Sequence, residues 1–119
     1  MGATVLKASG VVIGVGGIQP LEQAGLFEIG WWIWKHYWNR GLATEMARGL
    51  VKYAFEVMRL PQVVAIVDPP NQASRRVAEK LGMTYQGVRN AHDLAERHPD
   101  MEVAYYMLER PGKTAVAAG

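Results

Sequence analysis

The chain has 119 residues, is 50% apolar and 20% charged, and has a formal net charge of +2. This size and balance predict one globular domain without a nucleic-acid partner, and the absence of cysteine excludes disulfides and thiolate chemistry. No apolar run reaches the ~18 residues of a membrane span, so we expect a cytoplasmic protein without a membrane partner.

The first third of the chain is typical of β-strands. Residues 4–7 form a short apolar run, residues 11–18 are rich in β-branched residues and glycine, and residues 26–34 follow a short loop. Because each run is bounded by turn-forming residues, the pattern predicts three consecutive strands.

The second run contains the sequence GVGG at residues 14–17. It does not complete a dinucleotide-binding motif, because Gln19 occupies the third glycine position and no helix follows. We therefore interpret these residues as strand glycines that let another backbone approach closely.

The next segment has helical periodicity. Its apolar residues recur every three or four positions, with charged residues on the opposite face, and the pattern predicts a helix of four to five turns that ends before Pro61. The predicted apolar face consists of Leu42, Met46, Leu50, Tyr53 and Val57.

The second half of the chain alternates strands and helices. Residues 62–67 are continuously apolar, as in a strand buried on both faces. Asn71 is a suitable N-cap for a second helix, and Gly82 is a suitable residue to end it. Two further strands are predicted at residues 84–88 and 102–108, separated by a long polar loop.

The predicted order is therefore β-β-β-α-β-α-β-β, a mixed sheet with helices of the α+β or α/β-like class. Residues 1–110 are expected to form the single domain. Residues 111–119 are expected to form a flexible C-terminal tail.

The hexamer NRGLAT, residues 39–44, lies where the first helix is predicted to begin. The free N–H groups and the dipole at a helix N-terminus favour an anion. Gly41 and Ala43 leave the backbone bare, Arg40 adds a mobile positive charge, and Asn39 tolerates a left-handed backbone. By itself the hexamer fits a phosphate site and an ordinary capped helix equally well.

Two longer segments resemble a known family. EIGWWIWKHYWNRGLATEM, residues 28–46, resembles motif A of the GNAT acyl-CoA N-acyltransferases, and is most similar to the ribosomal-protein-alanine (Rim-type) branch. DPPNQASRRVAEKLGM, residues 68–83, resembles motif B of the same branch. Trp38 and Asn39 depart from the general family pattern, although this branch accepts tryptophan at the first of these positions. The resemblance covers about residues 3–110.

The resemblance implies a GNAT-type, mostly antiparallel sheet with helices on its faces. It also implies that the chain begins at the second strand of the family, without the first strand and the two helices that form one wall of the acceptor site. Acetyl-CoA would be the cosubstrate, with its pyrophosphate on residues 39–44 and its pantetheine arm on the backbone of residues 32–34. The implied cofactor-binding residues are Trp32, Ile33, Trp34, Trp38, Asn39, Arg40, Gly41, Leu42, Ala43, Thr44 and Asn71.

The family chemistry is direct attack of an amine on the thioester, which needs a base for the amine and a proton for the leaving thiolate. Glu28 is the candidate base, or else a solvated strand carboxylate. The tyrosine that often serves as the acid is replaced here by Ala78. Ser74, Tyr85 or water could supply the proton, with Ser74 the catalytic candidate, whereas Asn71 could also be only a helix cap.

The four tryptophans are expected to divide between the core and the acceptor cleft. Alternate strand residues face opposite sides, so Trp32 and Trp34 would face one way and Trp31 the other. The histidines lack the spacing of metal ligands, and we expect no metal site. All three are expected to be surface loop residues: His36, His92 and His98.

The leading hypothesis is an N-acetyltransferase that moves an acetyl group from acetyl-CoA to a primary amine on a protein N-terminus or a small molecule. The alternatives are a CoA-binding module without turnover and an interaction domain without a ligand. We also expect a homodimer, because residues 4–7 would form an unpaired sheet edge beside exposed apolar surface.

Overall fold

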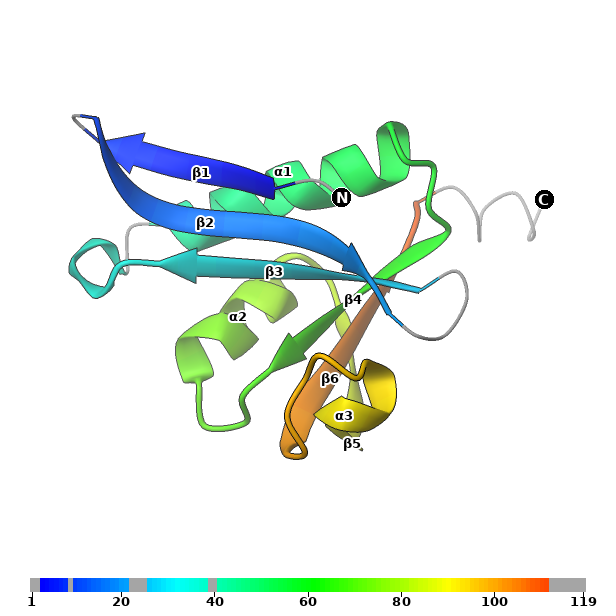
Figure 1. Cartoon of the computed structure of the whole chain (residues 1–119). Coiled ribbons are helices and arrows are strands. Elements are labelled where there is room, and N and C mark those ends of the chain that lie inside the picture. Colours follow the sequence, from blue (N-terminus) through cyan, green and yellow to red (C-terminus); the bar gives the residue numbers. More distant parts are fainter. Residues whose placement is uncertain (1–2, 9, 22–25, 39–40, 112–119) are drawn as a thin grey trace.

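The computed structural model describes residues 3–8, 10–21, 26–38 and 41–111 (Figure 1). The strands are β1 (Ala3–Ala8), β2 (Val11–Pro20), β3 (Phe27–Ile33), β4 (Gln62–Val67), β5 (Thr84–Asn90) and β6 (Glu102–Glu109). The helices are η1 (Lys35–Tyr37, a 3₁₀ turn), α1 (Leu42–Glu56), α2 (Gln72–Lys80) and α3 (Ala91–Leu94). The predicted order is confirmed, with η1 and α3 added. From residue 112 onward, the expected tail lies outside the described residues.

The described strands form one sheet in the order β1-β2-β3-β4-β6-β5. Its neighbours pair antiparallel except β3 and β4, which are parallel. These two strands pair only where Glu28 lies opposite Val64. Beyond that point they diverge, so that the two halves of the sheet open away from each other (Figure 1). The mixed, mostly antiparallel sheet predicted from the sequence is confirmed.

Each face of the sheet has its own apolar core. Helices α1 and α2 cover one face, where Val63 and Ala65 of β4 are buried. On the other face Val64 packs with Tyr105 and with Ala95, which follows α3. The alternation along β4 confirms that residues 62–67 form a strand buried on both faces.

Two glycines of the GVGG sequence allow α1 to lie close to the sheet. A Cβ at Gly16 would come within 2.8 Å of Met46 Sδ and 2.9 Å of Leu50 Cδ1. A Cβ at Gly14 would lie 2.5 Å from Cδ1 of Ile33 on β3 and 3.4 Å from Cε of Met46 on α1. No side chain fits at these contacts without displacing its neighbours. The GVGG residues are strand glycines, as interpreted from the sequence, but at Gly16 the shortest contacts are to the side chains of Met46 and Leu50, and the backbone carbonyl of Gly30 follows at 3.1 Å.

Helix α1 begins and ends where the periodicity predicts, but two residues of its predicted apolar face are exposed. Tyr53 is 46% exposed and Val57 62% exposed. Steps of four residues from Leu50 lead to Ala54, which is fully buried. Because successive residues turn by roughly 100° around the helix axis, Tyr53 is rotated away from the core. The prediction favoured the larger apolar side chain over the alanine that faces inward.

Helix α2 is fixed at both ends. The side chain of Asn71 accepts a hydrogen bond of 3.1 Å from the backbone N–H of Ser74, which confirms the predicted N-cap. After the helix, Gly82 adopts φ +86°, as expected of a glycine at a helix C-terminus. Arg75 donates from Nε to the hydroxyl of Tyr106 (3.0 Å), which raises the pKa of Arg75 and ties α2 to β6. The first turn of α2 therefore has a defined position beside the sheet.

The polar segment between β5 and β6 contains the short helix α3. The side chain of Asn90 caps it by accepting a 2.9 Å hydrogen bond from the N–H of His92. Four residues are too few to show a helical period, so the sequence predicted only a loop. Among the described residues, no helix is long and apolar enough to cross a membrane.

Candidate functional site

The divergence of β3 and β4 creates two adjacent cavities. One, of about 150 Å³, lies between the end of β3, the start of α1 and α2. The other, of about 190 Å³, lies between the separated strands. Trp31, Asn71 and Ser74 line both cavities, so the two are separated by little more than these side chains. A ligand in the first cavity could therefore present a reactive end to the second.

The first cavity is suited to an anionic ligand. Arg76 and Lys80 of α2 contribute positive charges to its wall, and the first turn of α1 contributes backbone N–H groups. The residues of the sequence-predicted cofactor set that line it are Trp32, Ile33, Trp38, Gly41, Leu42, Ala43, Thr44 and Asn71. Trp34 lies outside this lining, and Asn39 and Arg40 lie outside the described residues.

Gly41 forms the edge of this cavity at the N-cap of α1. Its φ of +75° is in the left-handed region, which residues with a Cβ rarely adopt. The first intrahelical bond, from the N–H of Glu45, reaches the Gly41 carbonyl at 3.0 Å, so the preceding N–H groups have no partner within the helix. A Cβ at Gly41 would meet no atom within 4 Å. This open, donor-rich position fits a phosphate.

The tryptophans divide between the core and the surface. Trp31 packs against the core, whereas Trp32 and Trp34 are 56% and 45% exposed. Trp38 donates from Nε1 to the carbonyl of Ile33 at 2.8 Å, which fixes the turn between β3 and α1. Within the described structure, Trp31 Nε1 is a buried donor without a hydrogen-bond partner, and its residue borders both cavities.

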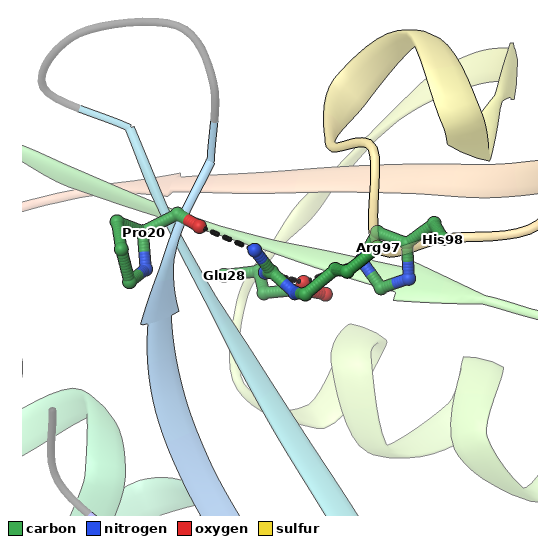
Figure 2. A network of polar contacts seen from close by, with 4 residues as sticks. All are labelled: Pro20, Glu28, Arg97 and His98. Atoms are coloured by element: carbon green, nitrogen blue, oxygen red, sulfur yellow. Dashed lines mark hydrogen bonds and ion pairs between the residues drawn. The ribbon is translucent and has the colours of Figure 1, made fainter.

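Glu28 lies at the point where the strands separate, and its side chain is only 13% exposed. Its Oε1 lies 2.6 Å from His98 Nε2 and accepts a hydrogen bond from the guanidinium of Arg97. Arg97 also donates to the carbonyl of Pro20 at 2.8 Å (Figure 2). Glu28 is thus a largely enclosed carboxylate held by a loop about 70 residues away in the sequence.

Neither partner of Glu28 was predicted from the sequence. His98 was expected at the surface, yet its side chain is only 24% exposed and contacts Glu28. His92 is exposed as expected. The structure does not describe the side chain of His36. Arg97 had no distinguishing sequence feature. No local pattern could have joined these residues to Glu28, because the contact depends on how α3 packs under the sheet.

Ser74 and Tyr85, the two side chains considered as proton donors, occupy different environments. Ser74 is in the first turn of α2 and borders both cavities. Tyr85 is 47% exposed on β5, with its ring 5.3 Å from that of Tyr106 and the guanidinium of Arg75 over its face. It is outside the lining of both cavities.

Comparison with protein families identifies residues 1–84 as an acetyltransferase (GNAT) domain. YkkB of Bacillus subtilis, an uncharacterized protein, is 40% identical over 81 residues, which are 66% of this chain and 47% of YkkB. YdaF of the same bacterium is named provisionally as a ribosomal N-acetyltransferase. It is 33% identical over 107 residues, which are 88% of this chain and 58% of YdaF. The chain thus spans about half the length of these relatives.

Solved structures have the same fold. An acetyltransferase from Agrobacterium tumefaciens is 32% identical, with a TM-score of 0.70 over 92% of this chain and 61% of that one. RimJ from Mycobacterium smegmatis, solved in complex with CoA-disulfide, is 23% identical, with a TM-score of 0.73 over 97% of this chain and 58% of that one. The second likeness is one of fold alone.

Proposed function

Because the chain belongs to the GNAT acetyltransferase family, we propose that it is an N-acetyltransferase that uses acetyl-CoA to acetylate a primary amine. The observation that carries this proposal is the separation of β3 and β4 beyond Glu28, with a donor-rich cavity on one side of the opening. The name of YdaF favours a protein N-terminus as the acceptor, and small-molecule amines are the other class to test. The cytoplasm is the proposed location.

The first cavity is the proposed binding site for acetyl-CoA. The N–H groups of residues 41–44 hold the pyrophosphate, supplemented by Asn39 and Arg40. The proposed contact for the amides of the pantetheine arm is the backbone of residues 32–34, in the manner of an added strand. Within this segment the Trp34 N–H already donates to the Ile13 carbonyl at 2.7 Å and the Ile33 carbonyl accepts from Trp38, so the arm has to use the remaining backbone groups. Asn71, the cap residue of α2, also lines this cavity. When bound, acetyl-CoA supplies an acetyl thioester as the acyl donor.

Glu28 and Ser74 are the proposed catalytic residues. Glu28 takes a proton from the acceptor ammonium, so that an N–H bond breaks and its electron pair remains on nitrogen for the attack. Ser74 is placed to pass a proton to the leaving sulfur, since it borders both cavities. The positive end of α2 next to it also favours the thiolate. These positions support Ser74 over Tyr85 as the proton donor.

The experiment combines binding and turnover. Isothermal titration calorimetry measures the affinity for acetyl-CoA, and a thiol reagent measures CoA release with a panel of peptides and small amines. Because the chain has no cysteine, the thiol reagent gives no signal from the protein itself. We expect acetyl-CoA to bind and CoA release to require an amine. Binding without amine-dependent release would instead support a CoA-binding module.

A homodimer is proposed from an exposed apolar row across three strands. Val5 pairs with Val15 and Val15 pairs with Trp32, so the three side chains share one face of the sheet. They are 54%, 42% and 56% exposed, and β1 is an edge strand. A second copy on this row would cover it, burying about 1,000 Å² or more in total. Light scattering at micromolar concentration tests this, and a stable monomer would contradict it.

A further inference from the structure

The contacts of Glu28 converge on one of its two oxygens. The guanidinium of Arg97 donates to Oε1, and His98 Nε2 lies 2.6 Å from the same atom (Figure 2). Among the described residues, these are the charged or titratable groups in contact with the carboxylate. Within the part of the chain that the structure describes, Oε2 has no hydrogen-bond partner. Because the terminal torsion of a glutamate rotates broadly, two partners on Oε1 fix the direction of Oε2.

From this geometry we propose that Arg97 and His98 are positioning residues that orient the Glu28 carboxylate toward the acceptor amine. The inference rests on the proposed function, in which Glu28 takes the proton of the acceptor. The proton moves from the ammonium nitrogen to Oε2, while Oε1 keeps its two partners throughout.

The loop that carries both residues is braced at several points. The second guanidinium nitrogen of Arg97 donates to the carbonyl of Pro20, at the end of β2. The N–H of His98 donates to the carbonyl of Ala95 at 3.0 Å, and Ala95 is only 2% exposed. The loop therefore has a fixed position relative to the sheet, as a group that orients a reactive carboxylate requires.

The side-chain arrangement beyond Glu28 leaves room for an acceptor. Gly30 is the next residue on the same face of β3, and it borders the cavity between the separated strands. A Cβ there would meet no atom within 4 Å, so the space at Gly30 is open, whereas Glu28 itself lies outside the linings of both cavities. Its strand partner is Gly17, which also lacks a side chain. In this proposal the acceptor amine reaches Glu28 from the cavity by passing these two glycines.

A merely structural role for the same contacts makes a different prediction. If Arg97 and His98 only fastened the loop to β3, their loss would lower the melting temperature and leave kcat largely intact in the folded protein. If they orient Glu28, their loss lowers kcat while the affinity for acetyl-CoA is unchanged, because the cofactor site lies on the other side of Trp31 and Ser74.

The test compares His98→Ala with His98→Gln, and Arg97→Ala with Arg97→Lys. We expect His98→Ala and Arg97→Ala to lower kcat by about tenfold or more, since small misplacements of a catalytic group are costly. His98→Gln retains a side-chain N–H for Oε1 and should restore most of the rate. Arg97→Lys should recover only part, because lysine cannot bond Glu28 and Pro20 with a planar fork. His92→Ala, a change at an exposed histidine nearby, should leave kcat unchanged.

The measurements are kcat, KM for the amine, the acetyl-CoA dissociation constant and the melting temperature of each variant. If both alanine variants keep the kcat of the parent, the inference is overturned but the proposed function is not. Equal loss of rate in His98→Gln and His98→Ala would have the same consequence. Absence of amine-dependent turnover in the parent would overturn the proposed function, and this inference with it. If an alanine variant does not fold, Arg97→Lys and His98→Gln are compared with the parent instead. A partial loss of kcat in Arg97→Lys, with kcat largely kept in His98→Gln, then supports the inference.

Discussion

Replacing Gly41 tests the proposed phosphate site at the start of α1. Its φ of +75° is costly for any residue with a Cβ, by about 1–2 kcal/mol. No atom lies within 4 Å of the position of a Cβ, so a clash with the protein adds little to this cost. Gly41→Val should therefore lower the free energy of unfolding by about 2 kcal/mol and leave the fold intact. Its branched side chain would project into the space proposed for the pyrophosphate.

The affinity of Gly41→Val for acetyl-CoA should fall at least tenfold, equivalent to ~1.4 kcal/mol. Calorimetric titration measures this affinity, and urea unfolding measures the stability. The matched control is Gly49→Ala, on the exposed face of the same helix, where a Cβ also meets nothing within 4 Å and φ is ordinary. Because alanine favours a helix, this control should stabilise the protein by roughly 0.5–1 kcal/mol without changing the affinity.

Measuring stability and affinity together separates the cost of the left-handed backbone at Gly41 from the loss of acetyl-CoA binding. Gly41→Val that binds acetyl-CoA as tightly as the parent would refute the assignment of the pyrophosphate to the start of α1. A folded variant with weakened binding, alongside an unaffected Gly49→Ala, would support it.

Three further substitutions test the fold and the site. Gly16→Val should destabilise the protein by roughly 1–3 kcal/mol in urea unfolding, because its side chain would overlap Met46 and Leu50; unchanged stability would contradict the close packing of α1. Glu28→Gln should lower kcat about 100-fold or more, with acetyl-CoA affinity unchanged by calorimetry; an undiminished rate would exclude Glu28 as the base. Gly30→Val should raise KM for the amine without lowering the melting temperature, and an unchanged KM would exclude the proposed acceptor path.

The parts of the fold that the sequence predicted correctly depend on neighbouring residues. Asn71 caps α2 and Gly82 ends it because each acts on backbone groups within a few positions. The buried strand at residues 62–67 was recognisable from its own apolar run. The start of α1 at Gly41 was likewise indicated by the adjoining hexamer.

The features that the sequence did not predict depend on distant packing. Ala54 faces the core instead of Tyr53 because the sheet fixes the rotation of α1, which periodicity alone leaves uncertain by one position. His98 and Arg97 reach Glu28 only when the segment after α3 folds back onto it. The positions of the proposed catalytic groups are thus set by tertiary structure, whereas the proposed phosphate-binding start of α1 could be suggested from neighbouring residues alone.

The most direct test of the proposed function follows the acetyl group itself. The chain is incubated with isotopically labelled acetyl-CoA and a panel of peptide and small-molecule amines, and the products are identified by mass spectrometry. The proposal predicts labelled acetyl on the nitrogen of at least one amine, at a rate that depends on the enzyme and falls sharply in Glu28→Gln. Tight binding of acetyl-CoA with no labelled amine from any acceptor, or equal labelling by Glu28→Gln and the parent, would contradict it.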